Sequence, residues 1–356
     1  MGVADRIIEA LQVPFLVEGQ DLTIGGSIVI AVAHGAGDRA DELLRNADVA
    51  MYTAKGKGKG RVAVFDPLMH AALVARHALS AELSHSVAAD ELAVYYQPIV
   101  ELRTGRPTGV EALVRWRHPT RGLVSPDDFI PLAEENGLIL SLGRWVLTEA
   151  CRQGAEWVRS ANLAEDFRIS VNLSPHQLQQ PGFIEEIEQI LAMTGLPSSR
   201  LVLELTETAM FRDTTTTITK LEALRAQGVH IAVDDFGTGY SSLGYLRRFP
   251  VDILKIARDF VVDADRGPDE WAFAHAIVAL GQTLGLRIVA EGIEQLGQAD
   301  RLMELGCEFG QGFHYGRPMV VDAIEAVLAE HGVIRFDQDA ATPRLPGGLV
   351  APAPAA

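Results

Sequence analysis

Two adjacent carboxylates, Asp234 and Asp235, follow an apolar run and precede a glycine-rich turn in the stretch HIAVDDFGTGYSS at 230–242. Neighbouring carboxylates repel each other unless one takes up a proton or a cation neutralises both. The pair is therefore a candidate metal site. The alternative, which is the more frequent one for an isolated pair, is that one Asp caps the next turn and the other is solvated.

The elements that would position this pair are short apolar runs that alternate with segments of amphipathic helical spacing. Such alternation favours parallel strand pairing and an α/β fold of the closed (β/α)8 TIM-like barrel type, with a doubly wound open sheet as the alternative. In a barrel the chemistry lies at the carboxyl ends of the strands. The runs are AVYYQPIV, GVEALVRW, RISVNLS, LVLELTE, HIAVDD, DILKIA, LRIVAE and CEFGQGF.

Each run ends in polar side chains that a barrel would direct toward one mouth. They are Gln97, Glu111, Asn172, Glu204 with Glu207, Asp234 with Asp235, Lys255, Glu291 with Glu294, and Gln311. Five converging carboxylates, those of Glu111, Glu204, Asp234, Asp235 and Glu291, need divalent cations to neutralise them. A ligand set made only of oxygen donors favours Mg²⁺ or Mn²⁺ over zinc. Two ions that share Asp234 would lie ~4 Å apart, the arrangement that supports phosphoryl displacement by a bridging water.

Two cationic side chains meet the remaining needs of such a reaction. Lys255 can hold an attacking water in line or lower its pKa, and Arg115 offers a forked donor to a phosphate or a guanine edge. The alternatives are an ion pair with one of the acids for Lys255 and a solvated surface position for Arg115.

The composition is that of a soluble globular protein: 356 residues, 48% apolar and 22% charged. The net charge of −16 argues against a DNA or RNA polymer as partner, while a small anionic substrate is compatible with local metal ions. Cys151 and Cys307 are expected to be buried core thiols. No apolar run approaches the ~20 residues of a membrane helix, and a signal peptide is not recognisable. We expect a cytoplasmic protein without a membrane segment.

The chain divides into four predicted parts. Residues 1–66 form a small α/β fragment, with a helix near 7–11, strands at 21–26 and 27–33, a helix at 40–55 and a strand at 61–65. Residues 67–86 are a helical linker, 87–335 the barrel, and 336–356 an Ala/Pro-rich disordered tail. The run KGKGKGR at 55–61 lacks the spacing of a phosphate loop and is interpreted as a solvated turn.

Seven motifs in order over about residues 83–335 together resemble the EAL-domain phosphodiesterases of bacterial cyclic-di-GMP signalling. They are EALVRW at 111–116, VNLSP at 171–175, ELTE at 204–207, DDFGTGYSSL at 234–243, LKI at 254–256, AEGIE at 290–294 and QGFHYGRP at 311–318. The resemblance implies a barrel whose first strand is antiparallel to the others. It also implies a cyclic-di-GMP-specific phosphodiesterase that forms linear pGpG with two Mg²⁺ or Mn²⁺ ions.

The resemblance further implies roles for single residues. The first metal would be held by Glu111, Asn172, Glu204 and Asp234, and the second by Asp235 with Asp234. Glu291 would be the catalytic carboxylate or a further ligand of the second metal, Lys255 and Gln311 would position the water, and Glu111 is essential to both binding and catalysis. Substrate contacts are implied for Gln97, Leu113, Arg115 and Gln311. Glu207 would restrain the loop that begins at Phe236 and Gly237 and couple a homodimer to metal binding.

One position departs from the family pattern, because Ala257 stands where an aspartate usually follows LKI. This puts substrate affinity or the support of Lys255 in question. Residues 1–66 resemble the C-terminal half of a GGDEF diguanylate-cyclase domain without the GGDEF motif, so we expect no cyclase activity there. Either the chain is a fragment of a longer GGDEF-EAL protein or its gene is truncated.

Hydrolysis of cyclic di-GMP has two alternatives. A non-catalytic cyclic-di-GMP receptor is the alternative, although the proposed metal ligands are all present. An unrelated barrel enzyme acting on a sugar phosphate would leave the remaining motifs unexplained.

Overall fold

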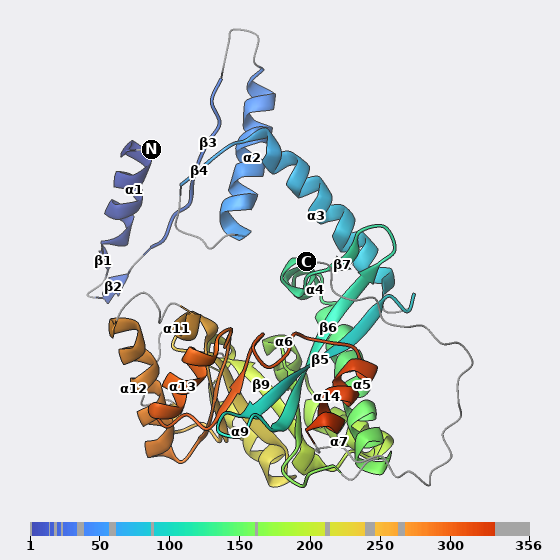
Figure 1. Ribbon diagram of the computed structural model, residues 1–356. Helices are drawn as coiled ribbons and strands as arrows, with labels where there is room; N and C mark the ends of the chain where they lie inside the picture. The colour runs from blue at the N-terminus through green and yellow to red at the C-terminus, as the bar shows by residue number, and fades with distance from the viewer. Residues whose placement is uncertain are drawn as a thin grey trace. The chain divides into compact units, whose positions relative to one another are not determined.

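The computed structural model describes residues 2–13, 15–17, 20–22, 24–33, 39–56, 62–86, 89–160, 163–210, 214–238, 246–262 and 268–331. It contains two compact units, Met1–Ser86 and Val87–Ala356 (Figure 1). The predicted tail at 336–356 and most of the predicted turn at 55–61 lie outside the described residues.

The first unit is a small α/β assembly whose two sheets have two strands each. Strands β3 and β4 pair in parallel and pack against α2. The antiparallel hairpin β1–β2 was not predicted in full, because only part of its second strand falls in the expected strand at 21–26. The elements are α1 Gly2–Gln12, β1 Phe15–Val17, β2 Gln20–Leu22, β3 Ile28–Ile30, α2 Ala40–Gly56, β4 Val62–Val64 and α3 Pro67–Ser86.

The second unit is a closed barrel of eight strands, which confirms the predicted fold and excludes the doubly wound sheet. The strand order is β5-β13-β12-β11-β10-β9-β8-β6, and β5 pairs with β6 to close it. Strand β5 is antiparallel to both neighbours, as expected, and the other barrel pairs are parallel. The strands are β5 Leu92–Glu101, β6 Pro107–His118, β8 Arg168–Asn172, β9 Leu201–Thr206, β10 His230–Phe236, β11 Ile253–Ile256, β12 Arg287–Ala290 and β13 Phe309–Gln311.

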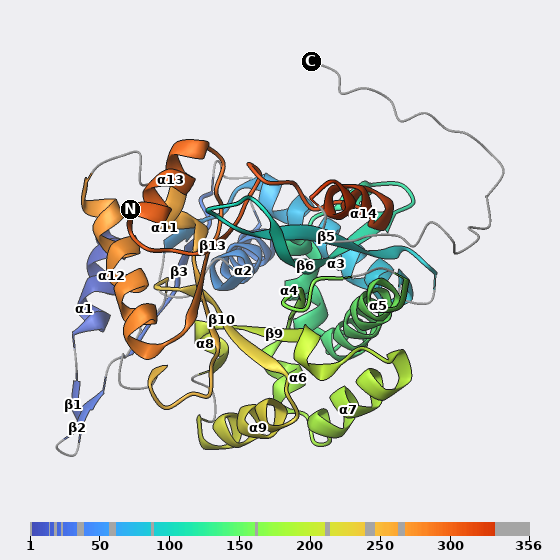
Figure 2. The same cartoon turned by 60° about the horizontal axis from the view of Figure 1, so that its bottom comes forward.

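Helices surround this barrel (Figure 2), and a short strand, β7 Gly122–Val124, extends β6. The predicted amphipathic segment at 183–194 forms α7, and the one at 271–285 lies in α12 except for its last residue. Helix α12 packs on β11 and β12, while α7 packs against α5, α6 and α9. The helices are α4 Pro126–Glu135, α5 Ile139–Ser160, α6 Pro175–Gln179, α7 Phe183–Thr194, η1 Ser198–Arg200, α8 Glu207–Met210, α9 Thr214–Ala226, α11 Arg258–Val262, α12 Pro268–Leu284, α13 Leu296–Glu304 and α14 Val321–Glu330.

Apolar side chains form one layer of the barrel interior. Five strands contribute one buried residue each to this cluster, and the ring of Phe309 packs against it: Ile99, Val202, Ala232, Ile253 and Val289. The buried thiols of Cys151 and Cys307 are free, as predicted, and burial raises the pKa of each to about 12. None of the helices in the described residues is long and apolar enough to cross a membrane.

Candidate active site

The polar site lies one layer above the apolar cluster, because alternate residues of a strand face the same side. On β9, β10 and β11, and at the end of β12, the polar residue follows the apolar one by two positions. On antiparallel β5 it precedes the apolar one by two. The pairs are Val202 with Glu204, Ala232 with Asp234, Ile253 with Lys255, Val289 with Glu291, and Ile99 with Gln97.

Lys255 lies at the centre of this layer, and its side chain is 1% exposed. Its Nζ lies 2.6 Å from carboxylate oxygens of both Glu204 and Glu291. Oxygens of Asp234 and Glu111 follow at 3.3 and 3.5 Å. The ion pair that the sequence offered as an alternative for Lys255 is therefore present, and it involves four acids rather than one.

The charges of this layer do not balance, because one ammonium faces four carboxylates. Burial opposes the charged form of Lys255, but the acids outweigh it and raise the lysine pKa well above its usual range. Burial also raises the pKa of Glu204, and it raises that of Glu291 to about 8. The pKa of Glu111 is lowered, because Lys255 and hydrogen bonds to its carboxylate outweigh its burial.

An amide network fixes Glu111 in this layer. Asn172 donates to Glu111 Oε1 at 2.6 Å, and Gln311 Nε2 donates to Glu111 Oε2 at 2.7 Å. The same Gln311 nitrogen lies 2.9 Å from Gln97 Oε1. Strand register explains why Gln97 joins the site, since it pairs with Glu111 in the middle of antiparallel β5 rather than at a strand end.

The two neighbouring aspartates reach the same site through an irregularity in β10. Consecutive strand residues normally point to opposite faces, yet the register of β10 shifts between Val233 and Phe236, and Asp235 has a φ of +52°. Carboxylate oxygens of Asp234, Asp235 and Glu291 consequently lie within 4.8 Å of one another. Burial, followed by the charge of Asp234, raises the pKa of Asp235. This group has the composition of a site for a hard divalent cation.

The loop after β10 begins with a hydrogen bond between its backbone and a buried carboxylate. Glu207, which is buried at the start of α8, accepts a hydrogen bond from the Gly237 backbone N–H at 3.1 Å. Phe236 is buried beside it. Glu207 therefore contacts the start of this loop, and its coupling to metal binding stays a prediction. Residues 239–245 lie outside the described part of the chain.

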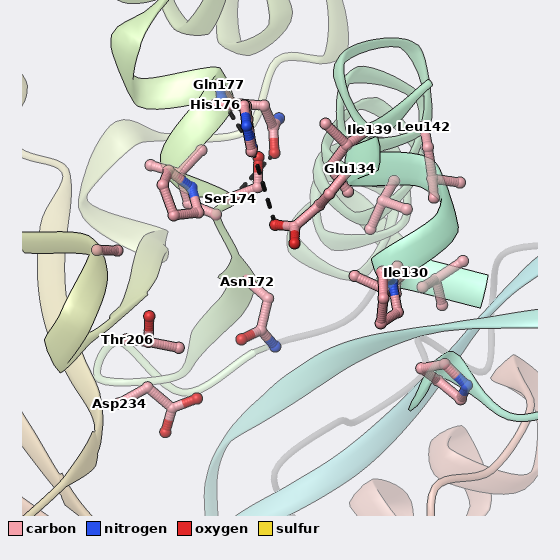
Figure 3. A pocket seen from close by; sticks show the side chains of 18 of the residues that line it. Ile130, Glu134, Ile139, Leu142, Asn172, Ser174, His176, Gln177, Thr206 and Asp234 are labelled. Atoms are coloured by element: carbon pink, nitrogen blue, oxygen red, sulfur yellow. Dashed lines mark hydrogen bonds and ion pairs between the residues drawn. The ribbon is translucent and has the colours of Figure 1, made fainter. Parts of the chain in front are cut away.

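Two cavities open on either side of the acids and share Leu113, Asp127, Asp234 and Asp235. The larger, about 680 Å³, is lined by apolar residues of α4 and α5 and by Asn172 (Figure 3). Its far end carries Glu134 and His176, 4.0 Å apart. The smaller, about 410 Å³, is more polar and contains Gln97, Arg258, Glu294 and Phe313.

Arg115, which the sequence predicts as a substrate contact, is not among the residues that line either cavity. It is half-buried, donates to the Val114 carbonyl at 2.8 Å, and lies 5.8 Å from the Tyr95 ring centroid. Its substrate contact stays a prediction.

Sequence reasoning missed Asp127 and gave no role to Arg258. Asp127 lies in the first turn of α4, and Arg258 opens α11 immediately beyond β11. The sequence signal that could have identified both residues is a charged side chain in the first turn of a helix that follows a strand. Ala257, the departure noted above, is 2% exposed and is absent from the walls of both cavities.

The chain belongs to the EAL domain family, because the family model matches residues 80–318. The model for the diguanylate cyclase GGDEF domain matches residues 1–61. Both matches confirm the resemblances seen in the sequence.

Among curated relatives, the bifunctional diguanylate cyclase/cyclic di-GMP phosphodiesterase MucR of Pseudomonas aeruginosa is 42% identical over 92% of this chain and 47% of its own length. The cyclic di-GMP phosphodiesterase NbdA of the same organism is 38% identical over 94% of this chain and 42% of its own length. The chain therefore spans less than half the length of these relatives. A solved structure described as the PaMucR phosphodiesterase in complex with c-di-GMP is 45% identical, has a TM-score of 0.67, and is matched over 69% of this chain and 99% of that one.

Proposed function

We propose that this protein is a cyclic-di-GMP-specific phosphodiesterase that hydrolyses cyclic di-GMP to linear pGpG. The observation that carries the proposal is the acidic layer around Lys255, which lies between two cavities. Relatives named as cyclic di-GMP phosphodiesterases, and a similar structure described as a c-di-GMP complex, support the choice of substrate.

The two cavities suit the two halves of a cyclic dinucleotide. Each has a volume within the roughly 300–1,000 Å³ typical of small-molecule sites. A substrate that spans both would place a phosphodiester over the shared residues Asp234 and Asp235. The apolar wall of the larger cavity offers a surface on which a base can pack.

Divalent cations fit this donor set, because Lys255 neutralises only one of five carboxylates. We propose two Mg²⁺ or Mn²⁺ ions, the first held by Glu111, Asn172, Glu204 and Asp234, and the second by Asp234, Asp235 and Glu291. When bound, such ions polarise phosphoryl oxygens and lower the pKa of water.

The protein side chains then orient the reaction. Lys255 and Gln311 would hold the attacking water. Glu291, whose carboxylate lies 2.6 Å from the Lys255 ammonium, would accept a proton from that water. The oxygen of water bonds to phosphorus, the bond from phosphorus to the ribose 3′ oxygen breaks, and that oxygen leaves with a proton. The product carries a 5′ phosphate, as pGpG does.

Three further assignments accompany this proposal. The protein is a cytoplasmic homodimer in which the Glu207 to Gly237 hydrogen bond couples the loop after β10 to the metal ligands. Residues 1–66 are an inactive GGDEF fragment, 67–86 a linker, 87–335 the phosphodiesterase barrel, and 336–356 a tail. Leu113, which lines both cavities, contacts the substrate together with Gln97, Arg115 and Gln311.

The test is incubation of purified protein with cyclic di-GMP and Mg²⁺ or Mn²⁺, with chromatography of the products. Wild type is expected to form pGpG, and Glu111→Gln to form none, because a metal ligand and the anchor of the amide network are lost. Glu101→Gln, at the other end of the barrel, is the matched control and should retain activity. Binding of cyclic di-GMP by wild type without any product would refute hydrolysis and favour the receptor alternative.

A further inference from the structure

Arg258 occupies an exceptional position in the smaller cavity. Among the described residues that line either cavity, it is the only lysine or arginine. It shares the smaller cavity with six carboxylates, those of Glu111, Asp127, Asp234, Asp235, Glu291 and Glu294. The acids around Arg258 repel an anion. The guanidinium of Arg258 is therefore the group on this wall that can attract one.

The side chain of Arg258 is held at this wall by two contacts. Its Nη2 lies 2.7 Å from Glu294 Oε1, and the two side chains are 58% and 38% exposed. Its stem lies over Gly292, where φ is +70° and an added Cβ would collide with Arg258 Cβ and Cγ. A glycine at 292 therefore leaves room for the arginine, and Glu294 holds the guanidinium while the cavity is open to solvent.

A cyclic dinucleotide carries two phosphodiesters, and the metal ions proposed at the acidic layer would bind only the one that is cleaved. Lys255 is fully enclosed by its carboxylate partners and cannot extend to a second phosphate. Arg115 is not on the wall of either cavity. A second phosphodiester that enters the smaller cavity would therefore meet one cation on the described part of its wall, Arg258, while Arg115 would reach the substrate from outside both walls.

We propose that Arg258 binds the phosphodiester that is not cleaved, exchanging its contact with Glu294 for the phosphate oxygens. This inference rests on the proposed function and names a positioning residue for the same site. Guanidinium and phosphate form paired hydrogen bonds that fix geometry as well as supply affinity. Arg258 thereby holds one phosphodiester in the smaller cavity while its symmetry-equivalent partner lies over the acidic layer.

Product binding tests this without turnover. Linear pGpG keeps the internal phosphodiester, whereas 5′-GMP lacks it. Calorimetric titration in Mg²⁺ should show that Arg258→Gln weakens pGpG about tenfold, as expected for loss of a partly exposed charged hydrogen bond, and leaves 5′-GMP within about twofold. In turnover assays the same variant should raise KM for cyclic di-GMP more than it lowers kcat.

Glu294→Gln separates a binding role from a structural one. Both substitutions break the ion pair, but only Arg258→Gln removes the cation, so Glu294→Gln should bind pGpG at least as tightly as wild type. Arg301→Gln, which breaks the 2.6 Å surface pair with Glu304, is the matched control. Equal weakening by Arg258→Gln and Glu294→Gln, or unchanged pGpG affinity in Arg258→Gln, would overturn the inference alone. Wild type that binds neither cyclic di-GMP nor pGpG would overturn the proposed function itself.

Discussion

Replacing Lys255 by methionine tests the electrostatic basis of the site, because it removes the ammonium and keeps most of the side-chain volume. Four carboxylate oxygens lie between 2.6 and 3.5 Å from Nζ. At an effective dielectric constant of about 20, each pair about 4 Å apart attracts by about 4 kcal/mol, or about 16 kcal/mol in gross terms. Repulsion among the acids and desolvation cancel much of this. Breaking a buried ion pair typically costs about 3–5 kcal/mol, which is the loss that we expect in unfolding free energy.

The loss should depend on pH in a defined direction. In the metal-free protein burial raises the pKa of Glu291 to about 8 and raises that of Glu204 well above its usual range, even with the lysine present. A carboxyl whose pKa is raised on folding contributes stability below its unfolded pKa and loses it as pH rises through the folded value. Without the ammonium, protonation of these acids is the remaining way to reduce their repulsion. The penalty of Lys255→Met should therefore be largest near pH 8.5 and smaller near pH 5.5.

Urea unfolding of wild type and Lys255→Met in EDTA at both pH values measures this directly. Lys220→Met is the matched control, because Lys220 Nζ donates only to the backbone carbonyls of Leu178 and Gln180, at 2.6 and 2.9 Å. That control should lose about 1–3 kcal/mol at either pH. A loss below about 1 kcal/mol for Lys255→Met near pH 8.5, or an equal loss at the two pH values, would refute the electrostatic reasoning.

Three other perturbations have defined outcomes. Asp252 is partly buried, which opposes ionisation, but its hydrogen bonds, including those from Arg225, lower its pKa. In urea unfolding, Asp252→Asn should therefore lower the unfolding free energy by about 1–2 kcal/mol near neutral pH. The difference from wild type should vanish as pH falls below the native pKa of Asp252. Ala257→Asp adds a buried acid near Lys255, so the melting temperature of the variant in EDTA should be lower than that of wild type. Adding Mg²⁺ should raise the melting temperature of the variant more than that of wild type, and an unchanged melting temperature in EDTA would contradict this. Glu207→Gln weakens the contact to the Gly237 N–H, and we expect about 1 kcal/mol less stability and a higher Mg²⁺ requirement for turnover; identical metal titrations would exclude the coupling.

Strand patterning predicted the barrel and most of the site, because residues two positions apart on a strand share one face. Glu204, Lys255 and Glu291 follow directly from that rule. The position of Gln97 was correct for a different reason, since β5 is antiparallel and strand register brings it to Glu111.

Other features could not be read from the pattern. The approach of Asp235 to Asp234 depends on a left-handed backbone conformation and a register shift, which no alternation of apolar residues encodes. Arg258 and Asp127 lie in helical first turns rather than on strands, so their place on the cavity walls depends on how the helices pack. Arg115, predicted as a forked donor to the substrate, lines neither cavity, and its guanidinium lies over the Tyr95 ring.

The most direct test of the central claim is the fate of solvent oxygen during turnover. Cyclic di-GMP incubated with wild-type protein and Mg²⁺ in water enriched in oxygen-18 should give pGpG with one labelled oxygen in its 5′ phosphate, and Glu111→Gln should give no product. Absence of pGpG with either Mg²⁺ or Mn²⁺, or pGpG without the label, would contradict hydrolysis by water at this site.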